Sequence, residues 1–142
     1  MIKTTIFSLF LLLAFSSCSD DSPSESIAGD YRGTFLCVVL PETVTTSFED
    51  VNISSVTEET FTIDLNVSSL PTLSGSINAN DDIEMNAFSG SIDGVELDFS
   101  GGTGQFVVDT IVGTMEPINT LVIGLTKVSD GTDCILNLTE KI

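Results

Sequence analysis

The stretch Phe61-Thr62-Ile63-Asp64-Leu65-Asn66-Val67-Ser68 alternates strictly between apolar and polar side chains. A period of two residues is typical of a β-strand that buries one face and exposes the other. Four further runs show the same alternation and are expected to be strands: 31–39, 95–100, 121–125 and 134–138. Weaker strand patterns cover 51–56, 73–79, 83–88 and 105–114.

Turn signals separate these runs. Asp93-Gly94 and Asp130-Gly131 are hairpin signals, because glycine adopts positive φ at little cost. We expect further turns at 78–82 and 100–104, which are rich in Asn, Asp or Gly. No window shows convincing helical periodicity, and no internal repeat is present. The chain is therefore predicted to be all-β, an antiparallel up-and-down barrel of about eight strands, with a β-sandwich as the alternative.

The front of the chain has the order of a signal peptide. Lys3 precedes an apolar core at 6–14, and small residues stand directly before Cys18. This order resembles a bacterial lipoprotein signal, in which the cysteine is lipidated and becomes the first mature residue. The core is shorter than the ~20 residues of a membrane-spanning helix. We expect a signal peptide at 1–17, lipidated Cys18 and a flexible spacer at 18–26, and one barrel domain at 27–142.

The acidic pair Asp20-Asp21 follows Cys18 closely. It resembles the export tag of some lipoproteins of gut Gram-negative anaerobes. That resemblance implies a lipid anchor in the outer membrane at the cell surface, with a periplasm-facing anchor as the alternative. A solvated linker would also explain two neighbouring acids.

Acidic residues dominate the charge. The 142 residues include 21 Asp and Glu against 4 Lys and Arg, a formal charge of −17 that falls to −18 without Lys3. Such a chain repels phosphate backbones, so we expect no nucleic-acid partner. It is also repelled by anionic headgroups, which favours an acyl tether over adsorption as its contact with a membrane.

The sequence contains no histidine. Histidine is the commonest general base, the usual partner of a Ser or Cys nucleophile and the commonest zinc ligand. We therefore expect a protein that is not an enzyme and has neither a metal nor a cofactor. Glu96 and Asp98 form a carboxylate pair of the kind a glycosidase uses, but alternation places both on the polar outer face, where solvation is the simpler explanation.

Two cysteines remain once Cys18 is assigned to the lipid. An even number in an exported protein makes a disulfide between Cys37 and Cys134 reasonable. The bridge would tie the first strand to the last. Two reduced cysteines packed as small apolar groups are the alternative.

The barrel domain opens with Ile27-Ala28-Gly29-Asp30-Tyr31-Arg32-Gly33-Thr34-Phe35. The form Ala-Gly-x-Tyr-x-Gly-Thr, directly after a lipidated cysteine and a short spacer, resembles the calycin-like β-barrel lipoproteins of gut Gram-negative anaerobes, which are lipocalin-like in shape. The resemblance covers 27–142 through this motif and the strand rhythm. It implies an up-and-down barrel and ligand binding, and it brings no catalytic residues. Tyr31, the single tyrosine, is expected to plug one barrel end with its hydroxyl hydrogen-bonded.

The barrel interior is the first candidate site. If packing is incomplete, a cavity remains for a small apolar ligand; a filled core is the alternative. The residues expected to face this space are Phe35, Phe61, Ile63, Leu65, Leu97, Phe99, Ile123 and Leu136, which Phe106 would join.

An apolar patch on the outside is the second candidate. Strands that are apolar on both faces imply a cover, such as a partner protein, a second copy or an oligosaccharide-handling complex. A local cover such as the loop expected at 41–47, or a sandwich whose outer face is partly buried, is the alternative. The outward apolar residues are Leu36, Val38, Leu40, Val107, Ile111 and Val122.

Two weaker candidates complete the set. Asn78, residues 80–82 and Glu84 gather oxygen ligands of the type that calcium prefers, although Asn and Asp also favour turns for backbone reasons, and a solvated hairpin is the better explanation. Asp109-Thr110-Ile111 resembles an O-glycosylation pattern of exported proteins in the same bacteria, which makes Thr110 a candidate acceptor.

These observations lead to two functional hypotheses. The first is a membrane-anchored, non-enzymatic binding module that holds a small apolar ligand in the barrel. The alternative is an interaction subunit of a cell-surface complex whose core is filled. The volume of the interior discriminates between them.

Overall fold

A computed structural model describes residues 26–39 and 42–142; the predicted signal peptide, Cys18 and the spacer up to residue 25 lie outside the described residues. The described chain forms strands β1 (Gly29–Val39), β2 (Glu42–Ser55), β3 (Thr60–Asp64), β4 (Leu73–Ile77), β5 (Asp82–Met85), β6 (Phe88–Ile92), β7 (Val95–Thr110), β8 (Pro117–Lys127) and β9 (Asp133–Glu140). Within these ranges no helix has the length and hydropathy needed to cross a membrane.

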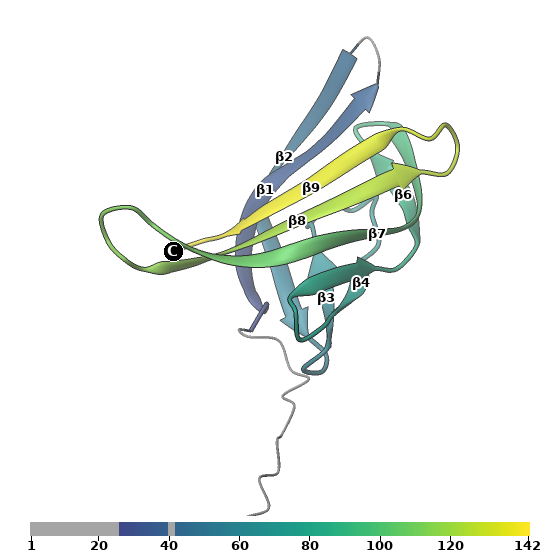
Figure 1. The fold of residues 1–142 in the computed structure, drawn as a ribbon. Coiled ribbons are helices and arrows are strands. Elements are labelled where there is room, and N and C mark those ends of the chain that lie inside the picture. The colour runs from purple at the N-terminus through teal and green to yellow at the C-terminus, as the bar shows by residue number, and fades with distance from the viewer. Residues whose placement is uncertain (1–25, 40–41) are drawn as a thin grey trace, which may run out of the picture.

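The sheet closes into a barrel of eight antiparallel strands. The pairing order runs β5-β4-β3-β2-β1-β9-β8-β7, and β5 pairs again with β7, while β6 adds an extra strand beside β7 (Figure 1). The predicted up-and-down barrel of about eight strands is therefore confirmed. Eight strands give an interior just wide enough to be filled by side chains or to hold one small ligand.

The chain folds this way because one face of every strand is apolar. The buried hydrophobic side chains of all nine strands form a single cluster in the barrel interior. In the described part of the chain this core contains no charged residue, and its one hydroxyl belongs to Tyr31. The alternation that predicted the strands thus decides which side chains face inward.

The disulfide joins the two ends of the domain. Cys37 in β1 lies directly opposite Cys134 in β9, and the Cα atoms are 4.1 Å apart. Of the two alternatives that the sequence left open, the structure has the bridge. It links residues separated by 97 positions in the chain.

Two predicted turns are confirmed by backbone geometry. Asp93 and Gly94 have φ of 50° and 80° between β6 and β7, and Gly131 has φ of 72° between β8 and β9. In the Asp93–Gly94 turn, positive φ at both central residues matches the right-handed twist of the flanking strands in a tight hairpin.

The turn predicted at 100–104 is wrong. These residues lie in the middle of β7, a strand of 16 residues. Their glycines allow neighbouring backbones to approach: a Cβ on Gly104 would lie 2.1 Å from the carbonyl oxygen of Val122. Only a local irregularity between Phe99 and Gly102, where Gly101 has φ of 130°, interrupts the pairing.

Two other boundaries differ from the sequence prediction. The strand expected at 83–88 is divided into β5 and β6, which lie end to end along one edge of β7. The loop expected at 41–47 is instead the start of β2, apart from residue 41, which is outside the described range. The expected cover of the outer patch by this loop is therefore wrong, because the segment pairs with β1.

Candidate functional site

The eight residues predicted to face the interior do so. Each has 6% or less of its surface exposed, and all belong to the one hydrophobic cluster, which Phe106 joins as expected. The eight are Phe35, Phe61, Ile63, Leu65, Leu97, Phe99, Ile123 and Leu136. Three phenylalanine rings pack together: the ring of Phe99 lies edge-on against Phe35, with centroids 5.9 Å apart, and tilted against Phe88, with centroids 5.0 Å apart.

A small hollow remains at one mouth of the barrel, between the start of β2 and the β6–β7 hairpin. It is lined by Phe35, Cys37, Val44, Thr46, Ile92, Val95, Leu97 and Lys127, and its volume is ≈ 30 Å³. We call it the mouth hollow. It has room for about one or two water molecules, whereas a small-molecule site takes at least ~300 Å³.

The other end of β1 is closed by Tyr31. Its side chain is fully buried, and its hydroxyl donates a hydrogen bond of 2.9 Å to the carbonyl oxygen of Ile27. Burial raises the pKa of Tyr31 well above its ordinary value, and the carboxylate of Glu140 raises it further. Tyr31 therefore has the plugging position expected of it, with its proton held on the phenol at neutral pH.

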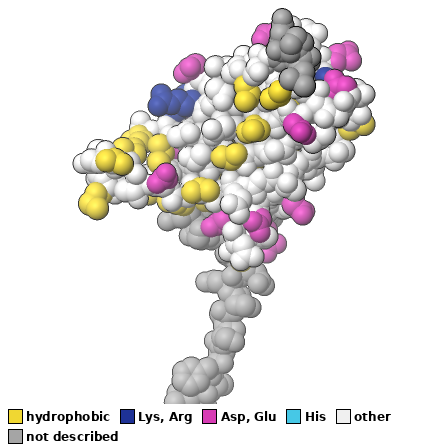
Figure 2. Space-filling view, turned by 45° about the horizontal axis from the view of Figure 1, so that its top comes forward, with side chains coloured by type: hydrophobic (Ala, Val, Ile, Leu, Met, Phe, Trp, Pro, Cys, Tyr) yellow, Lys and Arg dark blue, Asp and Glu magenta, His cyan; other side chains and the backbone are white. Residues whose placement is uncertain are grey.

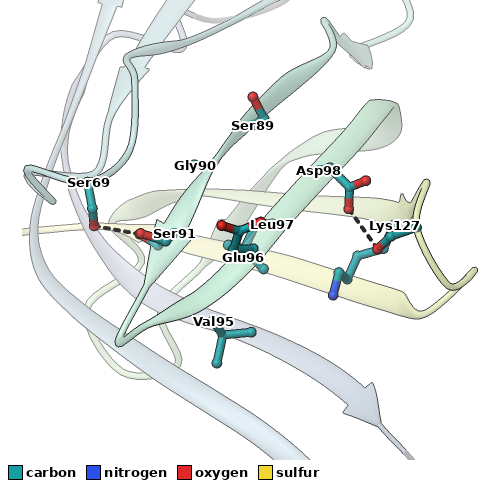
Figure 3. Close-up of a pocket in the computed structure, with 10 residues that line it drawn as sticks. Ser69, Ser89, Gly90, Ser91, Val95, Glu96, Leu97, Asp98 and Lys127 are labelled. Carbon is teal, nitrogen blue, oxygen red and sulfur yellow. Dashed lines mark hydrogen bonds between the residues drawn. The ribbon is translucent and has the colours of Figure 1, made fainter.

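Glu96 and Asp98 line a larger, polar hollow of ≈ 610 Å³ on the outside of the β6–β7 hairpin (Figure 3). Ser91 and Ser89 lie opposite them across the hairpin. Asp98 holds the β8–β9 turn against β7: its carboxylate accepts a hydrogen bond from the Ser129 hydroxyl, and its carbonyl accepts one from the Val128 N–H.

Lys127 is the cation that reaches this polar hollow. Its ammonium lies 3.5 Å from the carboxylate of Asp130 in the same turn. Hydrogen bonds from Thr132 lower the pKa of Asp130, and the charge of Lys127 lowers it further. Lys127 and Asp130 therefore stabilise the β8–β9 turn.

Glu96 and Asp98 face outward, as alternation predicted, and Asp98 forms a hydrogen bond with Ser129 in that turn.

Apolar side chains also lie on the outside of the barrel, in a diagonal line across β1, β9, β8 and β7. Val38, Ile135, Val122 and Val107 are between 41% and 49% exposed, and half-buried Leu36 lies opposite Ile135. We call these five residues the outer stripe. Figure 2 shows hydrophobic side chains crossing this face toward the protruding β7–β8 hairpin. Leu40 lies outside the described residues, and Ile111 is half-buried at the end of that hairpin.

The strand β2 has an open edge. β1 pairs with β2 from Glu42 to Ile53, apart from an irregularity after Phe48, but β3 on the other side of β2 pairs only with Asn52 to Ser55. Figure 1 shows the start of β2 without a strand on its outer side. The mouth hollow lies next to this open edge, because Val44 and Thr46 line it.

The remaining candidates are at turns and strand ends. The amide oxygen of Asn78 accepts the backbone N–H groups of Asn80 and Asp82, and the carboxylate of Asp82 accepts hydrogen bonds from Gln105 and Asn78, which lower its pKa. The side-chain oxygens of Asn78 and Asp82 thus accept hydrogen bonds within and beside this turn. Thr110 is exposed at the end of β7, and its glycosylation stays a prediction.

Comparison with protein families, with curated proteins and with solved structures finds no match to this chain. Function is therefore inferred from the geometry of the described residues.

The structure brings the predicted interior residues together and separates them from the carboxylate pair. Sequence reasoning missed two features, Ile135 in the outer stripe and the open edge of β2. The exposure of Ile135 could have been predicted from the sequence, because Ile135 lies between Cys134 and Leu136, which alternation places inward. The open edge could not, since it depends on where β3 stops pairing with β2.

Proposed function

We propose that this protein is a membrane-anchored, non-enzymatic interaction module of the cell envelope, built on a barrel with a filled core. The observation that carries the proposal is the distribution of apolar surface. Inward residues pack against one another, and a second set of apolar residues faces outward.

The inward set supports a filled core. Phe35 and Leu97, which would line a ligand chamber, instead line a hollow of ≈ 30 Å³. Tyr31 occupies the other end of the interior and is fully buried. Packing of this kind is the ordinary state of a protein core.

The outward set supports an interaction surface. Contiguous exposed apolar residues on a barrel wall are typical of surfaces that contact another molecule. The outer stripe crosses four strands, and the β7–β8 hairpin beyond it exposes Val112 and Met115 almost completely. A charge of −17 keeps such a surface soluble until a partner covers it.

The membrane anchor is the part of the proposal that rests on sequence alone. Cys18 follows an apolar segment that has the order of a lipoprotein signal. Acyl chains on Cys18 would hold the protein at the outer membrane, because each buried CH₂ contributes ~0.8 kcal/mol. The absence of histidine supports a non-enzymatic role.

Mass spectrometry of the protein purified from its own host tests the anchor and the filled core together. The mature chain should begin at Cys18 with acyl mass attached, and native and denatured masses should agree. Cys18→Ala should leave the protein in the soluble envelope fraction. A lipid released only on denaturation would overturn the filled core and support the apolar-ligand hypothesis.

Photo-crosslinking in intact cells tests the interaction surface. A crosslinker at Ile135, in the outer stripe, should yield adducts with another macromolecule. A matched crosslinker at Asp64, exposed on β3, should yield none. Equal yields at both positions would show that the outer stripe is not a specific contact surface.

A further inference from the structure

We propose that the open edge of β2 is a strand-addition site. An extended segment of a cationic partner polypeptide would pair with the backbone of Thr43–Ser47 and place alternate apolar side chains over the mouth hollow. The inference rests on the proposed function, since it names one docking surface of the same interaction module.

The edge is long enough for specific pairing. β2 has 14 residues, and β3 covers only the last four of them. Within residues 26–39 and 42–142, no backbone hydrogen bond joins Thr43, Thr45 or Ser47 to a segment other than β1. A row of unpaired N–H and C=O groups on a sheet edge is a template for another strand.

The register shows which backbone groups point outward. The Cα atoms of Cys37 and Cys134 are 4.1 Å apart, a spacing typical of an antiparallel pair that exchanges no hydrogen bonds. Cys37 therefore directs its N–H and C=O toward β2, where Val44 is its partner. Because these directions alternate, Thr43, Thr45 and Ser47 direct theirs away from β1. The donors and acceptors of an extended peptide backbone match this spacing.

The mouth hollow supplies the side-chain contacts. Val44 and Thr46 form its wall on β2, and Ile92 and Val95 form the facing wall on the β6–β7 hairpin. Val44 and Val95 are 43% and 46% exposed. A strand beside β2 would lie between these walls and cover both valines. Its inward positions would therefore take small apolar side chains, because the hollow has a volume of only ≈ 30 Å³.

The segment lacks the usual protection of free edges. Natural edges are guarded by lysine, proline or bulges. Thr43-Val44-Thr45-Thr46-Ser47 has no charge and no proline, is mostly β-branched and pairs regularly with β1. The register irregularity and the exposed acid Glu49 come after it.

The negative charge of this chain favours a cationic partner over a second copy of the chain as the occupant of this edge. Exposed carboxylates lie on the β6–β7 hairpin that forms one wall of the mouth hollow, at Asp93 and Glu96, and Glu49 is exposed on β2 beyond the edge segment. Lys127, the cation that lines it, already pairs with Asp130. Two copies that each carry a charge of −17 repel one another, whereas a basic segment is attracted.

A designed peptide tests the site on the full protein purified in detergent. The probe is a synthetic octapeptide in which valine alternates with lysine and threonine. It should bind saturably and slow amide exchange at Thr43, Thr45 and Ser47 by about 10-fold or more. Exchange at Val44 and Thr46 should not change, because their amides already bond to β1. The same peptide N-methylated at every second residue, or with glutamate in place of lysine, should bind about 10-fold more weakly or worse.

A pair of variants isolates the backbone contribution. Thr45→Pro removes one outward N–H and leaves the bonds to β1, so the peptide should bind about 10-fold more weakly. Thr45→Ala keeps the N–H and should bind as the unchanged protein does. The N-methylated peptide provides the same contrast without a variant, should Thr45→Pro disturb the fold.

Four results would overturn the inference. These are no saturable binding up to roughly 1 mM peptide, equal binding by Thr45→Pro and Thr45→Ala, equal binding of the N-methylated peptide, and a dimer whose Thr43 and Thr45 amides are already protected. None of them changes the mass or crosslinking results that test the proposed function. Conversely, a lipid in the barrel would overturn the filled core without altering amide exchange at β2.

Discussion

β9 and β2 flank β1 on opposite sides, and they differ in how completely they are paired. β9 pairs along its length with both β1 and β8, and the Cys37–Cys134 disulfide fastens it to β1. β2 pairs with β1 over most of its length, up to Ile53, but with β3 over only four residues. The contrast is that the β1–β9–β8 side is fully paired and cross-linked, whereas the start of β2 leaves backbone groups unpaired on one side.

Removing the disulfide should have the largest effect, because it acts on the well-paired side. In the chain-entropy model a bridge across 97 residues contributes about 4–5 kcal/mol. The double variant Cys37→Ala/Cys134→Ala should lose about that much free energy of unfolding in urea. The reduced unchanged protein should match it. A loss below about 1 kcal/mol would mean that strand pairing alone holds β1 to β9.

Truncating one side chain on each strand sharpens the contrast. Leu136 in β9 is 1% exposed and Val44 in β2 is 43% exposed. Leu136→Ala should cost about 2–5 kcal/mol, because it removes packed methyl groups and leaves a cavity. Val44→Ala should cost less than about 1 kcal/mol. Similar losses in urea unfolding would contradict the view that the start of β2 lies outside the stabilising core.

Glycine substitutions test how closely the strands approach. A Cβ at Gly33 would lie 1.9 Å from the carbonyl oxygen of Asn137 in β9, so Gly33→Ala must push β1 and β9 apart. We expect a loss of about 1–3 kcal/mol in thermal or urea unfolding. Gly124→Ala is the matched control, because its nearest neighbour would lie 3.7 Å away, and it should change stability by about 0.5 kcal/mol or less. A neutral Gly33→Ala would show that the two strands can separate there without cost.

Tyr31→Phe should have a modest effect at neutral pH. It deletes the hydrogen bond to Ile27 and leaves that buried carbonyl without this donor, a cost of about 1 kcal/mol. Equal stability of the variant and the unchanged protein at neutral pH would contradict this role.

The same residue predicts a loss of stability at alkaline pH. Burial, with Glu140, raises the pKa of Tyr31 in the folded state above the unfolded value of ~10. Its contribution is therefore complete below that pH and is lost as the pH rises above it, because only the unfolded chain ionises readily. Tyr31 is the single tyrosine, so phenolate absorbance measures its titration directly. Titration near pH 10 in the folded protein would contradict its burial.

Much of the core was predictable because alternation is a local property. Phe61, Ile63 and Leu65 are spaced two residues apart in an extended segment, so their side chains point to the same face, and all three are buried. The hairpins at Asp93-Gly94 and Asp130-Gly131 were also predictable from local sequence, because the geometry of such a turn requires positive φ, which glycine adopts readily. The glycines of 100–104 were misinterpreted, because local sequence does not distinguish a glycine that turns the chain from one that lets Val122 approach.

The sequence by itself determined the β class, the inward and outward faces, the acidic charge and the expectation of a lipidated Cys18. Each of these properties depends on which residue types are present and on patterns that extend over only a few residues. The tertiary structure decided that Cys37 meets Cys134, that the interior leaves ≈ 30 Å³ at its mouth, and that β2 keeps an open edge. These outcomes depend on which distant strands pair and where each pairing stops, and a pattern of period two is compatible with many such registers.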